Sequence, residues 1–186
     1  MPRAPRIQEP NVIYHVNARA ARRSFLFPSA GERDLFEDVL MIALPRAQVE
    51  CHSYCVMGSH YHLLLRPTLP NLAEAMKRLN WLYAWRFNRL FGFKGHCFES
   101  RYWSRPVRTS EQLITAVRYL ALNPVRAGLC DSPLAWPWSS YAALVGLAPA
   151  PEFLTVDLVL GEFGATPAAA RATIRRLVEE PDLAAA

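Results

Sequence analysis

The chain has 186 residues, of which 52% are hydrophobic, and a formal net charge of +5 at pH 7; these values predict one compact unit with a sizeable core and exclude a disordered chain. It holds no apolar run near the ~20 residues that cross a bilayer, no apolar secretory signal in its first residues, and only four scattered cysteines, too few for a disulfide scaffold. We therefore expect a cytoplasmic protein that has no membrane partner.

Hydrophobic periodicity and helix-capping residues predict alternating strands and helices. Ser29 with Glu32, and Thr109 with Gln112, have the spacing of helix N-caps. In chain order the expected elements are a strand at 11–19, a helix at 29–44, strands at 48–57 and 60–67 joined by a two-residue turn, a helix at 71–90, a short strand before 108 and a helix at 109–123. A proline follows the first and last helices and is expected to end each. This order predicts an α+β fold, a ferredoxin-like antiparallel sheet with helices packed on it.

The composition changes near Gly146. Residues 1–146 contain the elements above and are expected to form the principal domain. Residues 147–186 are rich in alanine and contain one amphipathic stretch near "AAARATIRRLVEE". They predict an accessory helix or a partly mobile tail.

Two histidines stand one residue apart in "VMGSHYHLLL", at positions 60 and 62. Residues i and i+2 of a strand point to the same face, so His60 and His62 lie roughly 6–7 Å apart at their Cα atoms. Two neutral imidazoles at this spacing can bind one divalent ion and leave room for a third ligand. The alternative is a pair of half-buried histidines that are hydrogen-bonded within the sheet.

The last predicted helix brings a phenol and an amide together. Tyr119 and Asn123 are separated by one turn, on the flank of the apolar face. Pro124 would make Asn123 the last helical residue or its cap. A phenol can attack phosphorus when a metal ion polarises the phosphate, and an amide oxygen can complete a two-histidine metal site. The alternative is a tyrosine at the edge of the core and an asparagine that caps the helix.

Basic residues concentrate in the middle of the chain. Residues 77–108 carry eight basic side chains and one acid, which suits a polyanionic partner. Trp81 and Trp85 lie among them, and aromatic rings between cations suit single-stranded bases. The alternatives are that the arginine content reflects the base composition of the genome, and that the tryptophans pack against the tail or a second subunit.

Several of these stretches, in this order, resemble IS200-like tyrosine transposases, and among them the REP-associated branch. The resemblance covers roughly residues 7–146. The stretches that carry it are "YHVNARAARR", "YCVMGSHYHLLL", "NLAEAMKRLN", "GHCFESRYWS", "RYLALNPVRAGL" and "WPWSSY". One departure is Gly58-Ser59, which stands where the family usually has Pro-Asn before the first histidine.

The resemblance implies a metal-dependent single-stranded DNA endonuclease and strand transferase of the HUH type, active in DNA transposition. Tyr119 would be the nucleophile that forms a 5′-phosphotyrosine. His60, His62 and Asn123 would bind Mg²⁺ or Mn²⁺. The partner would be single-stranded or hairpin DNA, bound by a monomer or a homodimer. No obvious general base is visible: His15 is a candidate, and the alternative that we favour is a structural residue of its strand.

Contacts with DNA are expected from basic residues around the predicted site. They are Arg22, Arg23, Lys77, Arg78, Arg101, Arg105 and Arg108. Three other functions remain open: a domesticated, non-catalytic DNA- or RNA-binding regulator on the same fold, a metal-dependent hydrolase that uses water, and a zinc site. The zinc site would join Cys51 and Cys55, on one face of their strand, to the two histidines, although their ~13 Å separation is wide for zinc.

Overall fold

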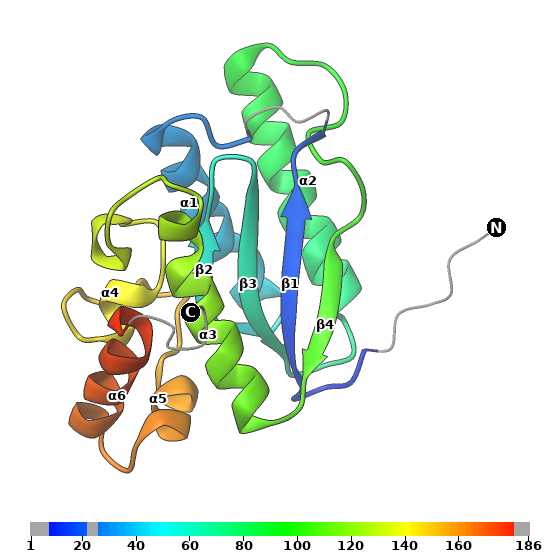
Figure 1. Cartoon of the computed structure of the whole chain (residues 1–186). Helices are drawn as coiled ribbons and strands as arrows, with labels where there is room; N and C mark the ends of the chain where they lie inside the picture. Colours follow the sequence, from blue (N-terminus) through cyan, green and yellow to red (C-terminus); the bar gives the residue numbers. More distant parts are fainter. Residues whose placement is uncertain (1–7, 22–25, 181–186) are drawn as a thin grey trace.

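The computed structural model describes residues 8–21 and 26–180. A four-stranded antiparallel sheet forms its centre, with strand order β2-β3-β1-β4 (Figure 1). The strands are β1 (Ile13–Arg19), β2 (Val49–Val56), β3 (His60–Pro67) and β4 (Trp103–Val107). This β-α-β-β-α-β arrangement confirms the predicted α+β, ferredoxin-like fold.

Helices cover both faces of the sheet, and each face has its own hydrophobic core. In Figure 1, α1 and α2 lie behind the sheet and α3 lies in front of it. The helices are α1 (Ala30–Arg46), α2 (Leu72–Phe91), α3 (Ser110–Arg126), the 3₁₀ turn η2 (Pro133–Ala135), α4 (Tyr141–Leu144), α5 (Asp157–Phe163) and α6 (Pro167–Glu179). Strand residues therefore alternate between two buried layers, which explains the nearly continuous apolar run in β3.

Local sequence signals start α1 and α3 as predicted. The backbone N–H of Ser29 donates to Glu32 Oε2 at 2.8 Å. At the start of α3, the backbone N–H of Gln112 donates to Thr109 Oγ1 at 3.2 Å. Each bond satisfies a donor that the first turn of a helix would otherwise leave unpaired.

The prediction that prolines end α1 and α3 was wrong. Pro45 and Pro124 lie inside their helices, one and two residues before the ends. In the last turn, proline removes only one helical hydrogen bond, and the backbone N–H of Ala127 still donates to the Asn123 carbonyl at 3.0 Å. The end of α3 is instead set by Gly128, whose φ of 67° is left-handed. Asn123 is thus an interior helical residue and not a cap.

Residues 157–179 form two helices that pack on α3, where the sequence predicted one accessory helix or a partly mobile tail. Val159, Ile174 and Val178 are buried in the same core as the apolar face of α3. Arg118 on α3 donates from Nε to the carbonyl of Leu177 at 2.6 Å. The division of the chain near residue 146 stays a prediction. Within the described residues, no helix is long and apolar enough to cross a membrane.

Candidate active site

The two central strands supply the polar face of the candidate site. In the β1–β3 ladder, Asn17 pairs with His62 and Arg19 pairs with His60. Paired residues project from the same face, and so does His15, two residues before Asn17. The ring centroids of His60 and His62 are 5.0 Å apart. This face is the one that α3 covers (Figure 1).

His15 touches His62 directly. His15 Nε2 and His62 Nδ1 are 3.0 Å apart, a hydrogen-bond distance. When His62 Nε2 carries a lone pair, its Nδ1 carries the proton and donates to His15. The contact therefore fixes which nitrogen of His62 is free to bind a ligand. The interpretation of His15 as a structural residue missed this contact.

Burial keeps all three imidazoles uncharged near neutral pH. Burial, followed by the charge of Arg105, lowers the pKa of His15 to about 4. Burial and then Arg19 lower the pKa of His60 to about 4. The pKa of His62 falls to about 3, chiefly through burial and then through its histidine neighbours and Arg19. Neutral rings of this kind retain the lone pairs that metal coordination requires.

Tyr119 reaches this cluster from α3. Its ring centroid lies 5.3 Å from that of His62 and 5.9 Å from that of His15, in edge-on contacts. The side chain is 37% exposed, so solvent or a substrate can reach it. The apolar face of α3 holds the helix in place, with Leu113, Val117 and Leu120 buried among the core residues of that layer. The structure thus brings the predicted nucleophile and the predicted histidine pair together.

Asn123 lies one turn after Tyr119 on the same helix. Its side-chain Nδ2 is buried and has no hydrogen-bond partner. Because Pro124 does not end the helix, Asn123 keeps helical geometry. Its side chain therefore leaves α3 on the same side as that of Tyr119. A buried amide nitrogen without a partner is costly. A metal ion would bind the side-chain oxygen of Asn123 and not this nitrogen.

These donors suit a divalent metal ion. His62 Nε2 is buried without a partner, while its Nδ1 is occupied by His15. Ser59 Oγ lies 3.2 Å from His60 Nδ1, which leaves His60 Nε2 available. Ser59 therefore makes a side-chain contact with the first histidine. Neutral imidazoles are ligands for divalent transition-metal ions, whereas an amide oxygen, water and phosphate oxygens are the ligands that suit Mg²⁺ or Mn²⁺.

The alternative of a zinc site is wrong. A β-bulge between Cys51 and Ser53 shifts the register of β2. Cys51 consequently joins the core beneath α1 and α2, while Cys55 joins the core beneath α3. The two cysteines lie on opposite faces, not on one face as the sequence suggested. Among the described residues, no three His, Cys, Asp or Glu side chains gather into a metal-binding group.

The predicted DNA-binding residues fall in different places. Arg105 on β4 is exposed and pairs with His15, so it borders the site. Arg101 is exposed just before β4, whereas Lys77 and Arg78 are exposed on α2, across the sheet. Arg108 is exposed but pairs with Glu9 through both terminal guanidinium nitrogens. Arg22 and Arg23 lie outside the described residues.

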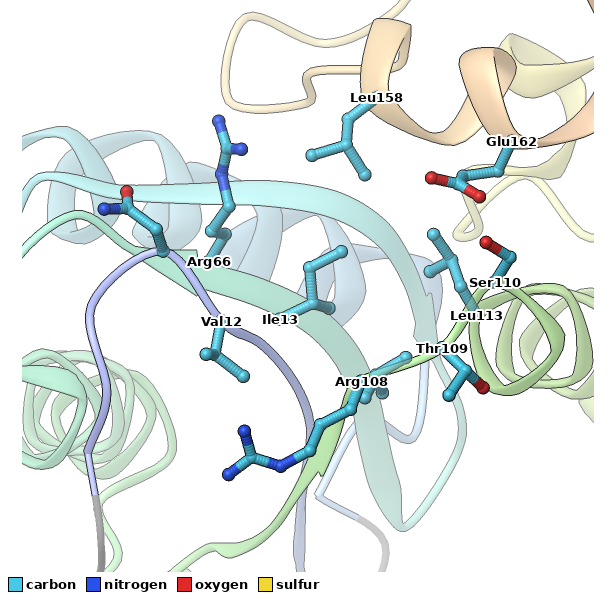
Figure 2. A pocket seen from close by; sticks show the side chains of 11 residues that line it. Val12, Ile13, Arg66, Arg108, Thr109, Ser110, Leu113, Leu158 and Glu162 are labelled. Carbon is cyan, nitrogen blue, oxygen red and sulfur yellow. The ribbon is translucent and has the colours of Figure 1, made fainter.

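A cavity of about 340 Å³ opens at the start of α3 and not at the candidate site (Figure 2). Its lining mixes charges and apolar groups, including Arg66, Arg108, Glu162 and Leu158. Neither Tyr119 nor the histidines line it. Tyr119 comes nine positions after Ser110, which corresponds to ~14 Å along a helix. We assign this cavity no part in the chemistry of the site.

Comparison with known proteins identifies the family. The model of the IS200-like transposases matches residues 8–123, a stretch that contains His60, His62, Tyr119 and Asn123. The chain belongs to the IS200-like transposase family. A solved structure described as a REP-associated tyrosine transposase bound to a REP hairpin matches with a TM-score of 0.67 and 18% identity, over 84% of this chain and 96% of that chain. At this identity the likeness shows a shared fold. A search of curated proteins found no match.

Sequence reasoning missed several residues of this IS200-like chain that border the site. Arg19 contributes to the low pKa values of both site histidines. Trp103 is 48% exposed, and its ring lies 5.7 Å from that of His15. The alternation of residues 13–19 places His15 and Arg19 on one face, but only the strand register shows that this face belongs to the histidine pair.

Proposed function

We propose that this protein is a metal-dependent single-stranded DNA endonuclease and strand transferase, with Tyr119 as its nucleophile. The observation that carries the proposal is the position of the exposed Tyr119 ring, 5.3 Å from the ring of His62. His62 has a free, buried ring nitrogen. His60, His62 and Asn123 would hold Mg²⁺ or Mn²⁺. When bound, that ion neutralises charge on the scissile phosphate.

The chain's own residues perform the covalent step. The Tyr119 oxygen attacks phosphorus, so a tyrosine O–P bond forms and the bond from phosphorus to the 3′ oxygen breaks. The phenol proton passes to water, which reaches the partly exposed side chain, and the leaving oxygen takes up a proton to become a free 3′-OH. A later attack by a 3′-OH on the 5′-phosphotyrosine reverses these changes and joins strands. Each phosphodiester bond that breaks is replaced by a phosphotyrosine ester bond, so no nucleoside triphosphate is consumed.

Basic and aromatic side chains around the tyrosine suit DNA. Arg19 and Arg105 are exposed on the strands that carry the site, and exposed guanidinium groups bind phosphate. Trp103 offers an exposed ring beside His15, on which an unpaired base can stack. A single strand at this edge would therefore have contacts for its backbone and for a base next to Tyr119.

The test is to detect covalent protein–DNA products. The protein, with Mn²⁺, is mixed with labelled single-stranded oligonucleotides from the DNA that flanks its own gene, and products are separated on a denaturing gel. A protein-linked band that disappears in Tyr119→Phe and persists in Tyr141→Phe, a buried tyrosine outside the site, supports the proposal. Cleavage that persists in Tyr119→Phe would indicate a water-using nuclease. Binding without cleavage would indicate a non-catalytic regulator.

A further inference from the structure

The outer face of α2 carries a stacked pair of tryptophans that no core explains. Trp81 is 63% exposed and Trp85 is 47% exposed. Their rings are nearly parallel, with an interplanar angle of 19° and centroids 6.5 Å apart. The buried side chains of α2, among them Leu79 and Tyr83, face the sheet instead. Since α5 and α6 pack on α3, across the sheet, they do not cover this pair.

Cations flank the two rings along one stripe of the helix. Lys77, Trp81, Trp85 and Arg89 follow one another at intervals of four residues, which stacks them along one side of α2. The Arg89 guanidinium lies 5.5 Å from the centroid of the Trp85 ring. Lys77 and Arg89 are exposed, and the one acid of α2, Glu74, is in its first turn. We call these four residues, 77, 81, 85 and 89, the α2 stripe.

We propose that the α2 stripe is a second binding surface for single-stranded DNA, on which unpaired bases stack on Trp81 and Trp85 while Lys77 and Arg89 contact phosphates. The inference rests on the proposed function in that DNA is the partner. Exposed aromatic rings between cations match the alternation of base and phosphate along a single strand. Paired bases inside a duplex have no free faces to offer, so the stripe favours unpaired DNA.

A second copy of the chain is a poorer occupant. A two-fold symmetric contact places the same patch of both copies together. It would bring the cations of one α2 stripe against those of the other, and like charges in contact are unfavourable.

The stripe is physically connected to the candidate active site. The end of α2 and the segment that follows it are tied together, because the Asn88 side-chain amide donates to the Gly95 carbonyl at 3.1 Å. That segment is bonded in turn to the end of β1, where the Glu99 N–H donates to the Arg19 carbonyl at 3.0 Å. Arg19 is the β-ladder partner of His60. In Figure 1 the end of α2 and the start of β4 lie at the same end of the sheet. The segment that follows α2 therefore links the helix that carries the stripe to the end of β1 beside His60.

The experiment measures the binding of a fluorescently labelled thymine oligonucleotide, about 20 nucleotides long, by anisotropy in EDTA, so that no strand is cut. Trp81→Ala and Trp85→Ala are each expected to weaken binding by about 5- to 150-fold, the range for loss of one stacked base. Trp→Phe at each position should keep most of the affinity. Leu147→Ala is the matched control, since Leu147 is 57% exposed and outside the stripe.

A second measurement does not depend on the folding of variants. Photocrosslinking of the unmodified chain to an oligonucleotide containing 5-bromouracil is expected to label the peptide that contains Trp81 and Trp85. Unchanged affinity in the alanine variants together with no crosslink there would overturn the inference, as would a shift from dimer to monomer in those variants. Because no strand is cut in EDTA, a failure of tyrosine chemistry in the gel assay would leave this result standing.

Discussion

Replacing His15 by alanine tests whether the hydrogen bond between His15 and His62 positions a metal ligand. The bond is 3.0 Å long and partly buried. In the tautomer of His62 that leaves Nε2 free for a metal ion, the change removes the acceptor of the Nδ1–H. An unsatisfied buried group of this kind costs ~1–3 kcal/mol. Loss of the outer partner of a metal-binding histidine typically lowers metal affinity ~10–100-fold. We therefore expect His15→Ala to bind Mn²⁺ ~10–100-fold more weakly.

Titration calorimetry with Mn²⁺ measures this affinity, and urea unfolding measures stability separately. His15→Gln should recover part of the affinity, since its amide oxygen can accept the same proton. The matched control is His52→Ala. His52 is also a buried strand histidine, but its Nδ1 bonds the carbonyl of Thr155 at 2.9 Å, away from the site. The His52→Ala variant should be less stable than the unmodified chain and should keep its Mn²⁺ affinity. A His15→Ala variant whose Mn²⁺ affinity stays within about twofold of the unmodified chain would refute the positioning role.

Three further predictions concern Glu37, Ile174 and Ser59. Burial raises the pKa of Glu37 from 4.5 to about 7. Between these two pH values the folded chain keeps a proton on Glu37 that the unfolded chain has released. The free energy of unfolding therefore falls as the pH rises, by at most about 1.4 kcal/mol per pH unit. Urea unfolding near pH 5 and near pH 8 measures this fall in the unmodified chain and in Glu37→Gln. The fall should be smaller in Glu37→Gln, and an equal fall in both proteins would contradict the raised pKa of Glu37. Ile174→Ala should lower the free energy of unfolding by ~2–5 kcal/mol, because Ile174 is fully buried beside α3; a loss below about 1 kcal/mol would mean that α6 is not held there. Ser59→Ala removes the hydroxyl beside His60 and should lower Mn²⁺ affinity in calorimetry about tenfold, whereas no change would leave Ser59 as a turn residue alone.

Features that depend on nearby residues could be predicted from the sequence. The caps at Ser29 and Thr109, the hairpin at residues 58–59 and the shared face of His60 and His62 each follow from spacing within a few residues. The β-α-β-β-α-β order then leaves few ways to pack an antiparallel sheet, which is why the ferredoxin-like fold was predicted correctly.

Features that depend on strand register could not be predicted. A single bulge in β2 places Cys51 and Cys55 on opposite faces, and no local signal announces it. His15 meets His62 only because β1 pairs with β3 in one particular register.

Pro124 was expected to stop α3, but packing of the helix against the core outweighs the loss of one hydrogen bond near its end.

The central claim is that Tyr119 becomes covalently attached to DNA. The most direct measurement is mass spectrometry of the trapped protein–DNA adduct after digestion with nuclease and trypsin. The account predicts a single modified peptide, which contains Tyr119 and carries a nucleotide 5′-phosphate on that residue. A phosphorylated nucleotide on another tyrosine, or cleavage of the DNA with no modified peptide, would contradict it.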